Sequence, residues 1–202
     1  YEGHPFLEAS SMRKFNGTYY FIYSSLNSHE LCYATSDNPT EGFEFGGVLV
    51  SNGYIGLPGI TDVKTASNCT GNTHGNLLEI NGSYYVFYHR HSKRKQSSRQ
   101  ACAERNRFEN GKFYQAEMTS CGLNDGLLKG KGNYPSYIAC NVYAQKGTRF
   151  LRMTKHFKSG HPYLTQEGKA LDPGSDPDGA NMCAGTVAGF NYYNIRDTTK
   201  VT

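Results

Sequence analysis

The chain has 202 residues and a formal net charge of +4, from 21 basic and 17 acidic residues. Its compact basic run, HRHSKRK at 89–95, is short and is explained as well by a solvated hairpin tip, so we expect no nucleic-acid partner. No apolar run is long enough to cross a bilayer as a helix, and we expect no membrane partner either. Gly (23) and Tyr (16) are abundant, which favours short strands joined by tight turns.

A repeated segment organises the first part of the chain. FNGTYYFIY at 15–23 recurs as INGSYYVFY at 80–88, and each copy contains Asn-Gly, the pair favoured in two-residue hairpin turns because both positions need a positive φ. In chain order, the first copy predicts four antiparallel strands, at 10–15, 18–25, 30–36 and 43–50. The second copy predicts four more, at 75–80, 83–91, 98–104 and 112–118. A recurring four-stranded unit is typical of β-propeller blades.

The sequence changes character after about residue 120. Residues 133–142 predict one more strand, and residues 144–180 are rich in Gly, Pro, Lys and Asp, as in a linker. Strand character resumes at 186–195 and 199–202. We therefore predict an all-β chain with a partial propeller at 1–143, a linker or extension at 144–184 and the beginning of a β-sandwich at 185–202. Two blades cannot close a propeller, so we expect the chain to be a fragment of a longer protein.

The six cysteines predict no zinc site. They stand at 32, 69, 102, 121, 140 and 183, with no CxxC pair. One or two disulfides would form in an oxidising compartment, with Cys102 and Cys121 as the expected pair, and buried free thiols are the alternative that the residues leave open.

Glu8 is a candidate general acid. It precedes a predicted strand and is flanked by Phe6, Leu7 and Ala9, and desolvation by such neighbours would keep a carboxyl protonated near neutral pH. The alternative is an ordinary exposed glutamate at a loop–strand junction, which the spacing alone favours. Glu104 and Glu117, on later predicted strands, are further acids with less distinctive surroundings.

Two more residues are candidates for ligand contacts. His74, in GNTHGNLLEING, enters the first strand of the second predicted blade, the strand that lines the channel of a propeller. It would contact a metal-bound water, a substrate hydroxyl or the acid itself, and a structural histidine is the alternative. Arg99, in SSRQACAE, would fork onto sugar hydroxyls or orient a carboxylate, unless it is a surface or ion-paired arginine.

Three linked motifs resemble glycoside hydrolase family 43. The run FLEASSMRKFNGTYYFIYSS and the following HELCYATSDNPTEGFEFGG resemble its acid-bearing blade, and THGNLLEINGSYYVFYHRH with SSRQACAE resembles its next blade. The resemblance covers about residues 1–142. The tail GTVAGFNYYNI, from Gly185, resembles more weakly the start of a family 6 carbohydrate-binding module.

The resemblance implies a five-bladed propeller that cleaves α-L-arabinofuranosyl or β-D-xylosyl linkages of plant-type polysaccharides with inversion. Glu8 matches the acid, His74 matches a histidine near a central calcium ion or its waters, and Arg99 matches an arginine near the sugar subsite. The family's two aspartates, a base and a modulator of the acid, have no counterpart here. Many members follow the acid with Gly-Pro, whereas this chain has Ala9 and Ser10.

These implications fix our expectations for the whole protein. We expect a secreted or periplasmic enzyme, monomeric at full length, that acts on arabinose- or xylose-containing oligosaccharides or polysaccharides, while the isolated fragment is inactive. Calcium is the one cofactor implied, as a structural ion on the propeller axis. The main alternative is a non-catalytic carbohydrate-binding propeller, and a protein-interaction propeller would not explain why the FLEASS and THGN motifs occur together.

Overall fold

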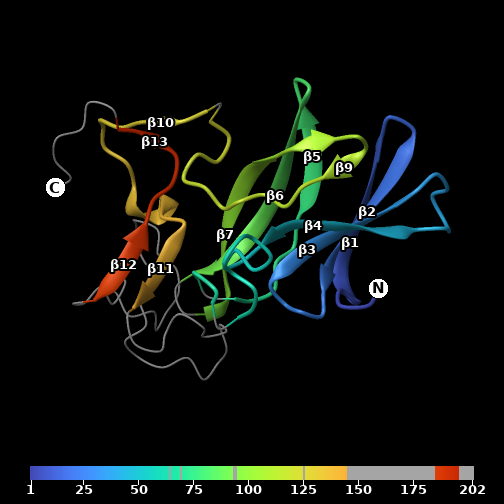
Figure 1. The fold of residues 1–202 in the computed structure, drawn as a ribbon, viewed down its shortest axis with the longest axis horizontal. Coiled ribbons are helices and arrows are strands. Elements are labelled where there is room, and N and C mark those ends of the chain that lie inside the picture. The colour runs from blue at the N-terminus through green and yellow to red at the C-terminus, as the bar shows by residue number, and fades with distance from the viewer. Residues whose placement is uncertain (64, 69, 93–94, 125, 145–184, 196–202) are drawn as a thin grey trace.

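Two antiparallel sheets form the body of the protein (Figure 1). The computed structural model describes residues 1–63, 65–68, 70–92, 95–124, 126–144 and 185–195. The first sheet has the order β1-β2-β3-β4, and the second has the order β5-β6-β7. Their strands are β1 (Phe6–Phe15), β2 (Thr18–Ser25), β3 (Glu30–Ser36), β4 (Glu44–Ser51), β5 (Asn76–Ile80), β6 (Ser83–Ser92) and β7 (Lys95–Asn106). The first predicted blade is thus confirmed strand by strand.

Asn-Gly turns close the hairpins where the sequence predicts them. Asn16 and Gly17, between β1 and β2, have φ of 50° and 91°, and Asn81 and Gly82, between β5 and β6, have φ of 50° and 76°. Positive φ at both central residues is the requirement of a type I′ turn, whose twist matches that of the flanking strands. Two short strands, β8 (Phe108–Glu109) and β9 (Lys112–Phe113), are joined by a third Asn-Gly turn that the repeat did not reveal.

The fourth strand predicted for the second blade, 112–118, is wrong. Only Lys112 and Phe113 are in a strand there, and β9 pairs with β8 rather than with β7. The segment instead crosses to the first sheet, where Ala116 donates its main-chain N–H to Leu49 O at 2.7 Å. The Tyr33 hydroxyl donates to Phe113 O and accepts from Phe113 N–H, each at 3.0 Å. These bonds satisfy the backbone of the segment without a place at the edge of β7.

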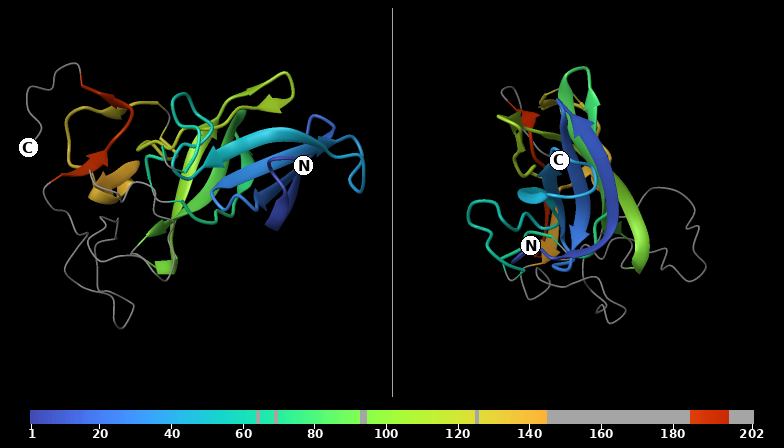
Figure 2. Two further views of the ribbon diagram at one scale, coloured as in Figure 1. Left: turned by 60° about the horizontal axis from the view of Figure 1, so that its bottom comes forward. Right: turned by 90° about the vertical axis from the view of Figure 1, so that its right-hand side faces the viewer.

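One aromatic cluster joins the two sheets. Phe113 is 4% exposed and its ring lies 5.2–6.1 Å, centroid to centroid, from four rings of the two sheets. The cluster comprises Phe15, Tyr20, Tyr33, Tyr84, Phe108 and Phe113. Gly46 allows this packing, because a Cβ there would lie 2.1 Å from Cε2 of Tyr33. The sheets therefore lie side by side and share one core (Figure 1 and Figure 2).

The chain beyond residue 120 forms small pairings beside this body. They involve β10 (Leu128–Lys129), a 3₁₀ turn (Ser136–Ile138), β11 (Asn141–Ala144), β12 (Thr186–Gly189) and β13 (Tyr193–Asn194). β11 pairs with β12 antiparallel and β10 pairs with β13 parallel. Asn191 Nδ2 donates to Tyr54 Oη and to Glu117 Oε1, each at 3.2 Å, so the described tail contacts the loops that adjoin the two sheets. The predicted linker beyond residue 144 and the predicted strand at 199–202 lie outside the described residues, and the division into domains stays a prediction.

The expected disulfide between Cys102 and Cys121 is absent. Both are free thiols, as are Cys32 and Cys140. Cys102 Sγ donates to Gln100 O at 3.6 Å and Cys121 Sγ donates to Tyr192 O at 3.7 Å, so each thiol is directed to a carbonyl rather than to the other. Cys69 and Cys183 lie outside the described residues. In the part of the chain described, no helix is long and apolar enough to cross a membrane.

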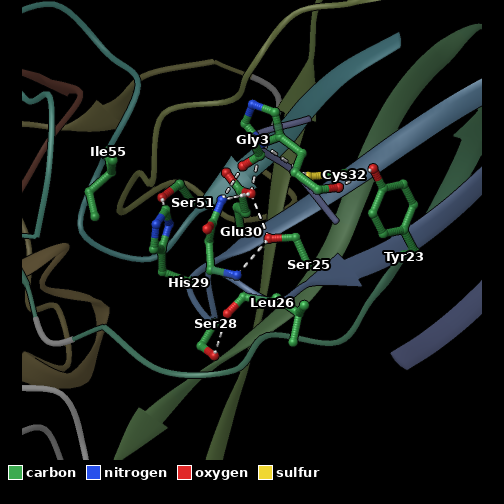
Figure 3. A network of polar contacts seen from close by, with 12 residues as sticks. Gly3, Tyr23, Ser25, Leu26, Ser28, His29, Glu30, Cys32, Ser51 and Ile55 are labelled. Atoms are coloured by element: carbon green, nitrogen blue, oxygen red, sulfur yellow. Dashed lines mark hydrogen bonds and ion pairs between the residues drawn. The ribbon is translucent and has the colours of Figure 1, made fainter. Parts of the chain in front are cut away.

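A buried carboxylate, Glu30, fixes the segment that leads into β1 (Figure 3). Its Oε1 accepts hydrogen bonds from Ser25 Oγ at 2.5 Å, Asn27 Nδ2 at 2.7 Å and His4 Nδ1 at 2.8 Å. The Tyr23 hydroxyl donates to His4 O at 2.9 Å. Burial raises the pKa of Glu30, but these hydrogen bonds outweigh burial and leave the pKa below its usual value. The network holds the start of β1, and with it the position of Glu8.

Glu30→Gln is expected to destabilise the chain by about 1.5–3 kcal/mol near neutral pH, because a charged acceptor with three donors is lost. The folded-state pKa of Glu30 is lowered, so its stabilisation is present above the unfolded-state pKa and disappears as the pH falls through the folded-state pKa. Urea unfolding of the 202-residue chain from neutral pH downward measures this. The difference in free energy of unfolding between the unaltered chain and the Glu30→Gln variant should become smaller as the pH falls. The control is Glu44→Gln, at an exposed position on β4, which should leave stability unchanged. A gap of constant size at all pH values would contradict the assignment.

Candidate active site

A β-bulge places Glu8 where β1 departs from regular pairing. Glu8 is opposite Ser24 of β2, and the register shifts on both sides of it, between Phe6 and Glu8 and between Glu8 and Ser11. Ala9 has φ of 57°, in the left-handed region that a residue with a Cβ rarely adopts. Bulges of this kind change the direction of a side chain and are frequent next to active sites. A glycine would adopt this φ without the steric cost that Ala9 incurs.

Two side chains from the segment that leads into the second sheet hold the Glu8 carboxylate. His74 Nε2 and Asn72 Nδ2 each lie 3.0 Å from Glu8 Oε1. Both come from the irregular segment 70–75 that precedes β5. The side chains of Glu8 and His74 are 45% and 41% exposed, so the pair is accessible to a ligand. Of the contacts expected for His74, the one with the acid itself is present.

The expected high pKa of Glu8 is wrong for this chain. The hydrogen bond from His74 is the largest influence and lowers the pKa of Glu8 below its usual value. Desolvation acts in the opposite direction but more weakly, and the charges of His74 and Arg99 and the Asn72 hydrogen bond lower the pKa further. The apolar neighbours in sequence do not enclose the carboxyl, since the Glu8 side chain is 45% exposed. Glu8 is therefore a carboxylate at neutral pH, a good acceptor for a hydroxyl donor.

Arg99, on β7, lies beside this pair without binding Glu8 directly. Its Nη1 is 2.7 Å from Nε2 and 3.0 Å from Nδ1 of His91, its cross-strand partner on β6. Its charge lowers the pKa of Glu8, while burial lowers the pKa of Arg99 itself. The structure thus brings Glu8, His74 and Arg99 into one electrostatic group. It does not form the bidentate Arg–carboxylate pair that the sequence leaves open.

A residue that sequence reasoning missed, His89, supports the group from β6. Its Nε2 accepts the main-chain N–H of His74 at 3.1 Å, and the two rings lie 5.2 Å apart, centroid to centroid. Burial lowers the pKa of His89 to about 4, assisted by the nearby charges of Arg99, His74 and His91. His89 is therefore neutral and keeps the lone pair that the contact needs. Its sequence context, HRH, indicates a hairpin tip. The alternation of His89 and His91, which puts both on one face of a strand, is the one sequence signal that could have identified His89.

The carboxyl with a raised pKa is Glu104, far along β7 from Arg99. It is 3% exposed, and burial raises its pKa to about 7 despite hydrogen bonds from Thr119 and Tyr88. It lines a cavity of about 360 Å³ with Cys102 and Cys121. Its two oxygens are occupied by these donors, which is the role of a structural carboxylate. Glu117, the other late candidate, accepts hydrogen bonds from Asn191 and Tyr192 in the tail.

A cluster of side chains that could bind a metal ion lies away from His74. Within the described residues, the only set of three His, Cys, Asp or Glu side chains with ligand atoms within 4.8 Å of one another is His4, Glu30 and Cys32. The hydrogen bonds of Glu30 already explain that set. Around His74, the ligand atoms are one carboxylate and one amide, far fewer than the roughly six to eight oxygens of a calcium site. These residues therefore do not fit calcium as a directly bound ion.

Replacing His74 by Ala is expected to raise the pKa of Glu8, because the largest influence that lowers it is removed. Carboxyl ¹³C NMR titration of the chain measures the change. Asn72→Ala should raise the pKa of Glu8 by less, since its hydrogen bond is a smaller influence. An unchanged Glu8 pKa in the His74 variant would show that the contact between His74 and Glu8 does not form in solution.

Ala9→Gly is expected to stabilise the chain by about 0.5–1 kcal/mol, since glycine adopts positive φ without the steric cost that alanine incurs, less the entropy that glycine loses on folding. Urea unfolding checks this, with Ala101→Gly on β7, where no positive φ occurs, expected to destabilise. Equal losses in both variants would contradict the bulge.

Comparisons with known proteins relate this sequence to carbohydrate-active enzymes. The chain matches no protein-family profile. A xylosidase/arabinosidase from Thermoclostridium stercorarium is 44% identical over the whole of this chain, which corresponds to 43% of that protein. A β-xylosidase from Xylanibacter ruminicola and a xylosidase/arabinosidase from Bacteroides ovatus are each 40% identical over 43% and 42% of the chain, and 22% and 21% of their own lengths. The chain therefore spans less than half of the relatives that it matches.

Solved structures give a weaker likeness. A family 43 β-xylosidase/α-arabinofuranosidase from a compost metagenome, in complex with xylotriose and in a calcium-free form, is 28% identical with a TM-score of 0.42, over 55% of this chain and 30% of that one. A family 43 arabinoxylan arabinofuranohydrolase from Bacillus subtilis, in complex with cellotetraose, is 20% identical with a TM-score of 0.46, over 63% and 28%. Likenesses at these TM-scores establish neither the fold nor the activity of the chain. The relatives of the chain are thus xylosidases and arabinosidases, and its structural neighbours are glycoside hydrolases of family 43.

Proposed function

We propose that the chain is part of an inverting glycoside hydrolase that cleaves arabinofuranosyl or xylosyl linkages of plant-type polysaccharides, with Glu8 as the general acid. One observation carries the proposal: in a chain 44% identical throughout to a xylosidase/arabinosidase, the accessible carboxylate of Glu8 is held by a histidine and an asparagine from the segment that leads into the neighbouring sheet. A bulge with a strained residue directs it there. A bulge and a strained residue next to an exposed carboxyl are typical of functional sites.

The reaction needs two carboxyl groups on opposite faces of the sugar. In inversion, a protonated carboxyl donates to the leaving glycosidic oxygen while a carboxylate base removes a proton from the attacking water, and the two are separated widely enough to admit that water. Glu8 is the proposed donor. We propose that the base and the aspartate that modulates the acid lie in the part of the relatives that this chain does not span, so that the isolated chain is inactive.

The low pKa of Glu8 sets a condition on this role. A donor must be protonated when the substrate binds, and His74 opposes protonation. A second carboxylate a few ångströms away would raise the pKa of Glu8 by like-charge repulsion, which is the work we propose for the missing modulator. Once Glu8 has given up its proton, the same His74 hydrogen bond stabilises the carboxylate that forms.

The other candidates have supporting roles in the proposal. His74 orients Glu8 through Oε1, which leaves Oε2 for the leaving oxygen. Arg99 supplies positive charge beside the carboxylate and is the proposed donor to a sugar hydroxyl. Calcium is assigned no step. We propose it only as a structural ion held mainly by water near His74, because the described side chains do not form an oxygen cage.

On the same basis we propose that the whole protein has a five-bladed propeller and a carbohydrate-binding β-sandwich that begins near residue 185. We also propose that it is a monomer at full length with a secreted or periplasmic location. The pairing of β12 with β11 means that such a sandwich would start in contact with the end of the predicted propeller segment.

A non-catalytic carbohydrate-binding propeller is the second candidate, and the lowered pKa of Glu8 favours it. A permanently charged carboxylate beside an imidazole and a guanidinium is a suitable acceptor and donor set for sugar hydroxyls without any proton transfer. The two candidates differ in one respect: only the enzyme needs Glu8 to be protonated.

A hybrid protein tests the proposal. Residues 1–202 replace the matching segment of the Thermoclostridium stercorarium relative, which supplies the remainder of the enzyme. We expect hydrolysis of xylobiose or an arabino-oligosaccharide, and Glu8→Gln should lower kcat/KM on it by about 10²–10⁴-fold because the leaving oxygen is no longer protonated. Hydrolysis of a dinitrophenyl glycoside should fall far less, since that leaving group departs without a proton.

Glu79→Gln, an exposed position on β5, is the control and should leave both rates unchanged. Circular dichroism confirms that each hybrid is folded. Equal losses on both substrates, or no loss, would contradict the acid role of Glu8. A folded hybrid that binds xylo-oligosaccharides in calorimetry but does not hydrolyse them would favour the binding protein.

A further inference from the structure

The segment that supplies Asn72 and His74 has no regular structure of its own. Residues 70–75 form no strand or helix, yet they present two side chains to Glu8 at the same distance, 3.0 Å. A segment without a ladder of backbone hydrogen bonds must be held by other contacts. The neighbouring elements must therefore hold residues 70–75 in place.

One residue of β6, His89, provides most of these contacts. His89 Nε2 accepts the His74 N–H at 3.1 Å, and His89 O accepts the Thr73 hydroxyl at 2.9 Å. A second anchor comes from the first sheet, where Ser24 Oγ donates to Thr73 O. Side chain and main chain of a single residue, His89, thus bind two consecutive residues of the segment. No other described residue holds the main chain of His74 itself by a hydrogen bond.

Two glycines bring the segment against the same strand. A Cβ at Gly71 would lie 2.2 Å from Cδ2 of His91, and a Cβ at Gly75 would lie 2.0 Å from Phe87 O. Phe87, His89 and His91 alternate along β6 and therefore share one face. Residues 70–75 therefore pack closely against β6 at Gly71 and Gly75, and His89 forms hydrogen bonds with the residues between them.

The chemistry of the His89 contact is specific. An imidazole nitrogen that accepts an N–H must carry a lone pair, so the ring is neutral with its proton on Nδ1. Nδ1 is itself buried and has no hydrogen-bond partner among the described residues. A leucine of similar volume could fill the space but could not accept the bond, whereas the Oε1 of a glutamine could. This contrast separates anchoring from packing.

We propose that His89 is a positioning residue of the candidate site, which holds the main chain of His74 so that the His74 ring meets Glu8. Its consequence for catalysis rests on the proposed function, whereas the anchoring itself does not. His89 touches no substrate in this proposal and acts only through His74. A displacement of His74 by about an ångström would suffice to cost a large factor in rate.

The first test is structural and needs no activity. The proposal predicts a scalar coupling across the hydrogen bond between the ¹⁵N nuclei of the His74 amide and His89 Nε2 in the labelled 202-residue chain. It also predicts a downfield His74 amide proton that moves upfield in His89→Leu and stays in place in His89→Gln. Absence of the coupling in the unaltered chain, or a His74 amide indifferent to His89→Leu, would overturn the proposal whether or not the protein hydrolyses glycosides.

The second test uses the hybrid and compares the two variants. His89→Leu should lower kcat/KM on xylobiose by about 10–100-fold and on the dinitrophenyl glycoside by much less, the pattern expected from a disturbed acid, and His89→Gln should recover most of the loss. His29→Gln, a buried histidine bonded to Ser51 outside the site, is the control and should retain full activity. If His89→Leu and His89→Gln lowered kcat/KM equally, at matched melting temperatures, His89 would only fill space and the proposal would be wrong. An inactive unaltered hybrid would count against the proposed function alone, because the coupling still decides the anchoring.

Discussion

The hydrogen bond between His74 and Glu8 is the interaction on which the candidate site depends. It joins a bulged position of β1 to an irregular segment before β5, residues 66 positions apart in the chain. It lowers the pKa of Glu8, fixes the direction of the carboxylate and connects the first sheet to the segment that leads into the second. A site of this kind exists only if both sheets keep their relative position to within about 0.5 Å.

The rest of the structure meets that requirement from both sides. On the side of the first sheet, Glu30 binds the segment that precedes β1, and the bulge at Ala9 sets the direction of Glu8. On the side of the second sheet, His89 holds the segment that carries His74. Between the sheets, the aromatic cluster around Phe113 fills the core and determines their spacing. Buried aromatic packing thus supplies the stability, and the hydrogen bonds supply the direction.

Local signals in the sequence predict the regular parts well. Asn-Gly pairs place two hairpins, and alternating aromatics place the strands of the first sheet, because both signals act within a few residues. The prediction of a fourth strand in the second sheet fails since its residues are satisfied by Tyr33 and Leu49, some eighty and sixty-seven positions away. The predicted pKa of Glu8 fails for a related reason: its neighbours in sequence are apolar, but its neighbours in space are His74, Asn72 and Arg99. His89 gives almost no local signal, because its importance lies in a main-chain contact.

In the proposed reaction Glu8 gives its proton to the leaving oxygen, and the pH dependence of the hybrid protein tests this role most directly. With xylobiose, kcat/KM should fall on the alkaline side as Glu8 loses its proton. In Glu8→Gln, measured on the dinitrophenyl glycoside that needs no acid, this alkaline limb should disappear while the acidic limb, which belongs to the base, persists. An alkaline limb that survives the substitution unchanged would belong to a group other than Glu8 and contradict the role proposed for Glu8.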